Sequence, residues 1–139
     1  MIVIINYGMG NLGSMLNMFR RIGAKAAIES DPDEVRKAGK LVLPGVGAFD
    51  AGMDRINTRP GLREVLEEKV LKNGTPLLGV CLGMQLLTNG SEEGQLPGLG
   101  WIPGRARRFP KKSGLKVPHM GWNVALPCRP NPLTKDLGE

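Results

Sequence analysis

The stretch that decides the fold of this chain lies near its middle and runs Thr75-Pro76-Leu77-Leu78-Gly79-Val80-Cys81-Leu82-Gly83-Met84-Gln85. It begins as a short apolar run, which is typical of a buried parallel strand, and it continues into residues that can form a helix. The pattern Gly79-x-Cys81-x-Gly83 in between is that of a sharp strand-to-helix elbow, which carries a nucleophile between small residues. The positive end of a helix dipole favours a thiolate there. The stretch therefore predicts a nucleophilic Cys81, and the alternative is a buried structural thiol.

The segments around the elbow alternate between strands and helices. Strands are expected at residues 1–6, 24–29, 40–43 and 75–80, and helices at 11–22, from 31 onward, at 49–57 and at 60–73. This alternation predicts an α/β fold, an open and mostly parallel sheet with helices on both faces. Because ligand chemistry gathers at the carboxyl ends of parallel strands, the loop Gly45-Val46-Gly47 is expected to lie near Cys81.

The composition indicates a globular chain without a metal site. Its 139 residues suffice for one domain with a core, and 41% of them are hydrophobic and 23% charged. No apolar run is long enough for a membrane helix, and a strand pattern starts at once, so we expect no signal peptide and no membrane association. Two cysteines and one histidine show no metal-ligand spacing. A reducing, cytoplasmic location is expected.

The net charge is +6, and much of the excess lies between residues 105 and 116. Such a cluster is one signature of a nucleic-acid surface. The alternative is the solvated face of a hairpin, which we favour because proteins that bind single strands use several aromatic side chains, and only Phe109 is interleaved here. No nucleic-acid partner is expected.

Five segments together resemble one family, the class I or triad-type glutamine amidotransferases. They are Asn6-Tyr7-Gly8-Met9-Gly10-Asn11, Pro44-Gly45-Val46-Gly47-Ala48-Phe49, Gly79-Val80-Cys81-Leu82-Gly83-Met84-Gln85-Leu86-Leu87, Ser91-Glu92-Glu93-Gly94 and Pro118-His119-Met120-Gly121-Trp122-Asn123. The first and last segments are similar to those of its imidazole glycerol phosphate synthase branch, the glutaminase subunits of histidine biosynthesis. The resemblance implies a flavodoxin-like fold and one glutamine amidotransferase domain over residues 1–139.

The resemblance also implies an activity and a set of site residues. Members hydrolyse glutamine to glutamate and ammonia without a cofactor, and Cys81 would form the glutamyl thioester. The backbone at Val46, Gly47 and Leu82 would stabilise the oxyanion. The residues implied to bind the substrate are Gly45, Gln85 and Glu93.

A partner follows from the same resemblance. Ammonia would pass to a (β/α)8-barrel cyclase subunit, which together with this chain would form a heterodimer. The residues implied to face that subunit are Asn11, Pro118, His119, Met120 and Trp122. The alternative for Trp122 is a place in the core of a hairpin.

The sequence departs from the family pattern in two ways. Members complete their triad with a His and a Glu in a His-Pro-Glu-like segment, and no such segment occurs in these 139 residues. We therefore expect a domain that is incomplete at its C-terminus, lacks its C-terminal strands and is inactive on its own. The second departure is Asn6, where the family usually has Asp.

Two alternative functions remain open. One is a catalytically inactive docking module of the same family. The other is a dinucleotide-binding domain, because Gly8, Gly10 and Gly13 form a G-x-G-x-x-G pattern between a strand and a helix, with Glu29 at the end of the next strand.

Overall fold

The computed structural model describes residues 1–110, 114 and 116–135. The chain divides into two units, Met1–Arg108 and Phe109–Glu139. None of the helices among the described residues is long and apolar enough to cross a membrane.

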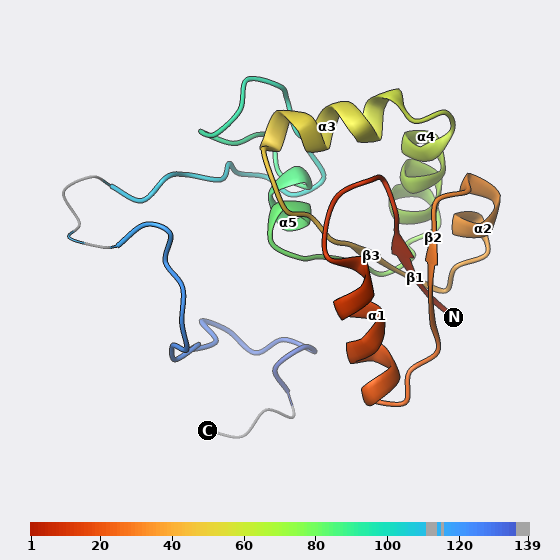
Figure 1. The fold of residues 1–139 in the computed structure, drawn as a ribbon, viewed down its shortest axis with the longest axis horizontal. Coiled ribbons are helices and arrows are strands. Elements are labelled where there is room, and N and C mark those ends of the chain that lie inside the picture. The colour runs from red at the N-terminus through yellow and green to blue at the C-terminus, as the bar shows by residue number, and fades with distance from the viewer. Residues whose placement is uncertain (111–113, 115, 136–139) are drawn as a thin grey trace. The chain divides into compact units, whose positions relative to one another are not determined.

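The first unit, most of whose elements are labelled in Figure 1, is built on a four-stranded sheet in which all strands are parallel. Its strands are β1 (Ile2–Ile5), β2 (Ala26–Glu29), β3 (Lys40–Leu43) and β4 (Leu77–Gly79), and their spatial order is β2-β1-β3-β4. This order is that of flavodoxin-like folds. The strand order reverses between β1 and β3, because β2 lies on one side of β1 and the later strands lie on the other. The sheet expected from the sequence is confirmed.

The helices of this unit follow the expected segments closely. They are α1 (Leu12–Arg21), α2 (Pro32–Arg36), α3 (Phe49–Thr58), α4 (Leu62–Glu67), the π-helical turn η1 (Glu68–Lys72) and α5 (Leu82–Leu86). Asn11 caps α1 by accepting from the Ser14 N–H at 3.2 Å, and Asp31 caps α2 through the Asp33 N–H at 2.8 Å. Such side-chain caps satisfy N–H groups that have no partner inside the helix.

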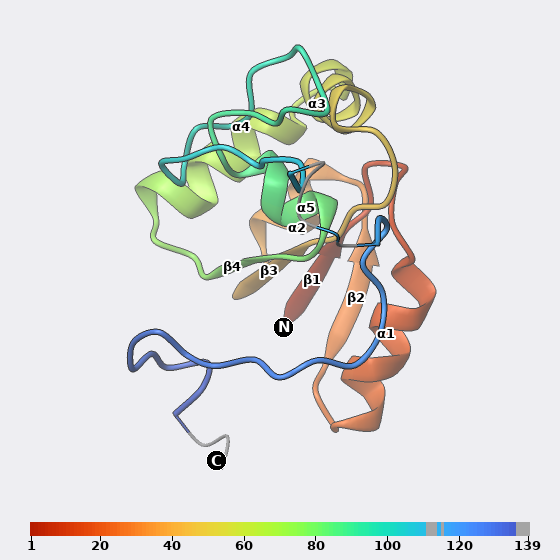
Figure 2. The same cartoon turned by 90° about the vertical axis from the view of Figure 1, so that its left-hand side faces the viewer.

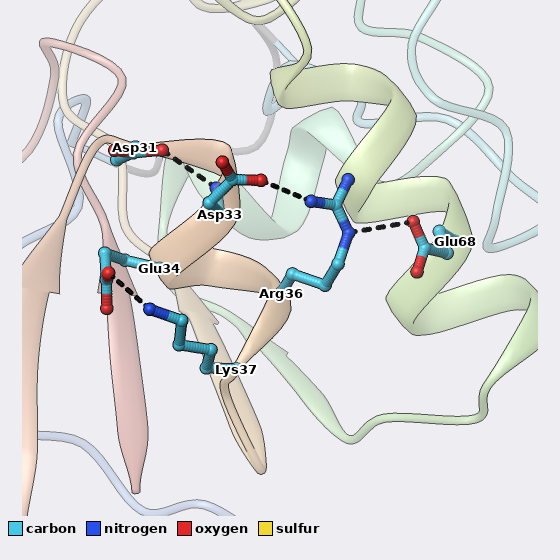
Figure 3. Close-up of polar contacts among 6 residues, drawn as sticks. All are labelled: Asp31, Asp33, Glu34, Arg36, Lys37 and Glu68. Carbon is cyan, nitrogen blue, oxygen red and sulfur yellow. Dashed lines mark hydrogen bonds and ion pairs between the residues drawn. The ribbon is translucent and has the colours of Figure 1, made fainter.

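The segment expected to be one helix at 60–73 begins two residues later and changes character. Gly61 has φ +72°, a left-handed conformation that does not belong to a right-handed helix, so the helix begins only at Leu62. The chain then continues from α4 into η1 without a break. Arg36 of α2 holds this region through Glu68 at 3.3 Å and also contacts Asp33 at 2.5 Å (Figure 3). Both ion pairs are exposed, so they contribute little to stability.

Helices cover both faces of the sheet, as expected. In Figure 2, α1 lies on one side of the strands, and α4 and α5 lie on the other. The core occupies the side of α2 to α5, where strand residues such as Val3 and Leu43 pack with Phe49, Met53 and Leu66. Burial of these side chains is the main favourable term in folding the unit.

The face on the side of α1 is only partly covered. No residue of α1 is buried. An apolar groove runs between this helix and the sheet, and its lining includes Phe19, Val42, Leu78 and Val80.

Beyond α5, the antiparallel pairing that a hairpin needs is not found among the described residues. Two isolated bridges occur there, Thr88 with Ile102 and Ser91 with Ala106, and both are parallel. The hairpin considered for residues 105–116 is not seen at the described positions, and residues 111–113 and 115 of that segment lie outside them.

Candidate active site

Three loops meet at the carboxyl ends of the strands. They follow β1, β3 and β4, and the first two flank the point at which the strand order reverses, where open α/β sheets bind ligands. The loops touch directly. Tyr7 donates its hydroxyl proton to the carbonyl of Pro44 at 2.6 Å, and a Cβ placed on Gly45 would lie 2.7 Å from the Gly83 nitrogen. The expected meeting of the 45–47 loop with the elbow is confirmed.

Cys81 occupies the elbow in a strained conformation. Its φ is 55° and its ψ is −119°, and among the described residues it is the only non-glycine residue with positive φ. A side chain in this conformation costs of order 1–3 kcal/mol and persists where the surroundings over-determine it. The Cys81 thiol is exposed, so the alternative of a buried structural thiol is wrong.

Close packing behind the elbow explains its two glycines. A Cβ on Gly79 would lie 2.7 Å from the Cα of Met84. A Cβ on Gly83 would overlap the Leu43 carbonyl group, whose carbon would be 2.7 Å away. That carbonyl already accepts from the Val80 N–H at 3.0 Å, so β3 and the elbow are locked together.

Three backbone donors of the 45–47 loop and the elbow have no acceptor among the described residues. The N–H groups of Val46, Gly47 and Leu82 donate no hydrogen bond within the part of the chain that the structure describes. Val46 is 63% exposed, and Gly47 has φ +124°, a conformation that L side chains rarely adopt. Free N–H groups are what an anionic tetrahedral intermediate requires.

Gln85, one turn beyond the elbow, carries an unpaired buried atom. Its Oε1 is buried and has no hydrogen-bond partner among the described residues. Buried polar atoms are almost always paired, so an orphan of this kind indicates a missing donor.

The loop that carries Glu93 is organised by Asp50, a residue that the sequence analysis did not single out. The Asp50 carboxylate accepts from the backbone N–H groups of Gln95 and Leu96, each at 2.9 Å. These hydrogen bonds lower the pKa of Asp50 below its ordinary value. Glu93 itself is exposed and donates its N–H to the buried Ser91 hydroxyl at 3.1 Å. An acidic residue in the first turn of a helix is already explained by its favourable interaction with the helix dipole. The sequence alone therefore did not indicate that Asp50 also binds a distant loop.

Replacement of Asp50 by asparagine is expected to loosen this loop and lower the melting temperature near neutral pH. The carboxylate stabilises the fold above the unfolded-state pKa of an Asp, because its folded-state pKa is lower, and the stabilisation is lost as the pH falls through the folded-state value. The difference in melting temperature between the two proteins should therefore shrink on acidification. Asp54→Asn on the same helix is the control, since among the described residues only the backbone carbonyl of Asp54, and not its carboxylate, accepts a side-chain hydrogen bond. A difference that is independent of pH would contradict this account.

The loop after β1 uses its glycines for packing. Gly10 has φ +100°, and a Cβ there would lie 3.1 Å from Pro44. Arg55 donates to the Gly8 carbonyl at 2.8 Å, and a Cβ on Gly8 would collide with this guanidinium. These contacts hold the turn against α3 and the loop after β3, and an open hollow lined by Gly10, Val46 and Arg55, among others, lies beside it. The Asn6 Oδ1 accepts from the Gly8 N–H at 3.1 Å, a role that an Asp carboxylate would fill equally.

The expected partner-facing residues are exposed. Asn11 lies at the start of α1 in the first unit. The others belong to the unit that begins at Phe109, and they are Pro118, His119, Met120 and Trp122. Trp122 is 105% exposed relative to its reference value, so the alternative of a hairpin core residue is not what the structure has. His119 Nε2 lies 3.5 Å from the Asn123 amide nitrogen.

Comparisons with known proteins agree with this geometry. The family Glutamine amidotransferase class-I matches residues 3–139. The chain is 51% identical over 139 residues to imidazole glycerol phosphate synthase subunit HisH 2 of Methanococcus maripaludis, with all of this chain and 68% of that protein covered. It is 49% identical to the protein of the same name from Pseudomonas aeruginosa, with the same coverage. It is 47% identical to subunit HisH of Bdellovibrio bacteriovorus, covering 99% of this chain and 68% of that protein. The chain belongs to the class I glutamine amidotransferases.

Proposed function

We propose that this chain is the glutaminase subunit of an imidazole glycerol phosphate synthase. The observation that carries the proposal is the exposed thiol of Cys81 on a strained elbow, in contact with the Gly45-Val46-Gly47 loop. The names of its relatives as HisH subunits of that enzyme support the same assignment. We further propose that the enzyme acts in histidine biosynthesis in the cytoplasm, and that residues 1–139 form one glutamine amidotransferase domain.

In the proposed reaction, the thiolate of Cys81 attacks the side-chain amide carbon of glutamine. A carbon–sulfur bond forms, and the electron pair of the carbonyl moves to its oxygen. Donors from Val46, Gly47 and Leu82 stabilise this oxyanion. When the intermediate collapses, the carbon–nitrogen bond breaks, and the nitrogen leaves as ammonia after taking up a proton. Water then hydrolyses the glutamyl thioester to glutamate and regenerates the thiol.

Two polar side chains are proposed to hold the amino-acid end of the substrate. The unpaired Oε1 of Gln85 would accept a hydrogen bond from it. The carboxylate of Glu93 suits the charge of the α-ammonium group. The backbone of Gly45, which contacts the elbow, would line the same space.

Complete turnover also needs a group that gives a proton to the leaving ammonia. General acid–base groups of this kind are most often histidines, and the one histidine of the sequence lies in the proposed partner segment. We therefore propose that the 139 residues alone release little ammonia from glutamine.

The test of the assignment is covalent capture, which needs the nucleophile but no turnover. We expect the γ-chloroketone analogue of L-glutamine to alkylate Cys81, with chloride as the leaving group, much faster than its D-enantiomer does. Cys128, which is also exposed, is the internal reference for unassisted thiol reactivity. Peptide mass spectrometry measures both sites. Equal labelling of the two cysteines, without preference for the L-enantiomer, would overturn the proposed function.

We propose that the partner is the (β/α)8-barrel cyclase subunit of the same enzyme. Apolar side chains of the second unit are exposed, among them Met120 at 84% and Trp122. Trp and Met are enriched at the cores of protein interfaces, and exposed apolar groups of this kind indicate a binding surface. His119 is assigned to this surface and not to catalysis.

Replacement of Trp122 by alanine is expected to weaken binding to the cyclase subunit by about 2 kcal/mol or more, since a Trp anchor often carries much of the binding energy. Titration calorimetry with the purified cyclase subunit measures the change. Lys135→Ala, at an exposed polar position of the same unit, is the control and should bind normally. Unaltered affinity of the Trp122 variant would show that the docking assignment is wrong.

A further inference from the structure

Tyr7 is a buried aromatic residue at the heart of the three loops. It lies two residues after the end of β1 and is 2% exposed. It is also the only tyrosine of the sequence. Its ring belongs to the main core cluster, whereas its hydroxyl reaches the loop after β3.

The hydroxyl fixes one end of that loop. It donates to the Pro44 carbonyl at 2.6 Å, a short and buried hydrogen bond between residues 37 positions apart. A Cβ on Gly45 would lie 2.8 Å from the Tyr7 hydroxyl oxygen and 2.8 Å from the Leu82 Cβ. The Pro44–Gly45 peptide is therefore enclosed between Tyr7 and the start of α5. The N–H groups of Val46 and Gly47 belong to the next two peptides along the chain.

We propose that Tyr7 is a positioning residue for the oxyanion loop, which its hydroxyl anchors at the Pro44 carbonyl so that the N–H groups of Val46 and Gly47 face the oxygen above Cys81. The inference rests on the proposed function of this site. Tyr7 acts only through the loop.

The energetics of the hydrogen bond favour this role. Pro44 is buried, and Tyr7 is the donor found for its carbonyl among the described residues. Removal of the hydroxyl would leave a buried carbonyl without a donor, and such a group turns toward water or costs free energy. Burial raises the pKa of Tyr7 to about 12, although the nearby charge of Arg55 acts in the opposite direction. The hydroxyl is therefore a proton donor over the whole physiological pH range.

The decisive experiment compares two reagents on Cys81 in the wild-type chain and in Tyr7→Phe. The γ-chloroketone analogue of L-glutamine has a carbonyl oxygen that can occupy the oxyanion site, whereas iodoacetamide alkylates the thiol by direct displacement of iodide. Tyr7→Phe should slow the chloroketone reaction at least about tenfold, a smaller effect than loss of a direct oxyanion donor. The rate with iodoacetamide should change little. Thermal melting follows the fold of both proteins.

The outcomes distinguish a failure of the proposed function from a failure of the role proposed for Tyr7. If wild-type Cys81 shows no preference for the L-chloroketone, the proposed function fails. If the wild type shows it and Tyr7→Phe keeps the same ratio of the two rates, the role of Tyr7 is overturned. If Tyr7 had only a general structural role, Tyr7→Phe would lower both alkylation rates together, or lower the melting temperature. The ratio of the chloroketone rate to the iodoacetamide rate would then stay the same.

A second version keeps the test decisive if Tyr7→Phe does not fold. Because Tyr7 is the only tyrosine, biosynthetic incorporation of 3,5-difluorotyrosine changes this site alone and makes its phenol more acidic. The charged groups that face the hydroxyl are Arg55 of α3 and Cys81 at the elbow. The iodoacetamide rate corrects for ionisation of Cys81. Preference for the chloroketone should then be lost at a lower pH in the fluorinated chain, and an unshifted pH profile would overturn the inference.

Discussion

Replacement of Cys81 by serine is expected to abolish capture of the L-glutamine chloroketone at this position. The rate should fall roughly 10⁴-fold or more, the scale on which catalytic nucleophiles contribute. A serine hydroxyl is a weak nucleophile unless an adjacent base removes its proton, and the unit Met1–Arg108 contains no histidine. A thiolate needs no such base once it is formed. Mass spectrometry of the peptide that contains residue 81 measures the loss directly.

The same variant should fold normally. Serine keeps the Cβ and nearly the volume of cysteine, and residue 81 is exposed, so the strain at φ 55° is unchanged. Cys128→Ser is the matched control and should leave capture at Cys81 intact. If Cys81→Ser were still modified at the wild-type rate, or if Cys128→Ser removed the modification, another residue would be the nucleophile.

The sheet and the elbow were predictable because each depends on local patterns. Short apolar runs separated by helix signals specify parallel strands, and the Asp31-Pro32 pair marks the start of α2 with a cap and a fixed φ. The spacing of Gly79, Cys81 and Gly83 similarly defines a turn that only small neighbours permit. The register of the sheet then brings the ends of β3 and β4 together, since Leu43 is paired with Gly79.

The contacts that organise the loops were not predictable, because they join residues far apart in the sequence. Asp50 binds the backbone at Gln95 and Leu96, and Tyr7 binds that at Pro44. No sequence spacing predicts which distant backbone group an Asp carboxylate or a Tyr hydroxyl will bind. The missing cover of α1 has the same origin. The sequence predicted the helix, whereas the amount of its burial depends on what packs at the groove lined by Val42 and Leu78.

The second large effect is expected from Gly83→Ala, which should destabilise the first unit by about 3 kcal/mol, the upper range for overpacking in a well-packed core. The added methyl group would overlap the Leu43 carbonyl group, with its carbon 2.7 Å away and the carbonyl carbon of Pro44 3.1 Å away. These are backbone atoms of β3 and the loop after it, so no side-chain rotation can relieve the overlap. The elbow would have to move away from the sheet, and the contact between Gly45 and α5 would be lost with it.

Gly13→Ala in α1 is the matched control for this substitution. Nothing lies within 4 Å of a Cβ at Gly13, and the residue is helical without a positive φ. The same chemical change there should stabilise the chain by about 0.4–1 kcal/mol, because alanine reduces the conformational entropy of the unfolded state. Urea denaturation of the two variants should therefore give changes of opposite sign. If Gly83→Ala unfolded at the wild-type urea concentration, the close packing of Gly83 against the Leu43 carbonyl group would not exist as described. If it unfolded at a lower urea concentration but kept selective capture at Cys81, this packing would stabilise the fold without setting the geometry of the nucleophile.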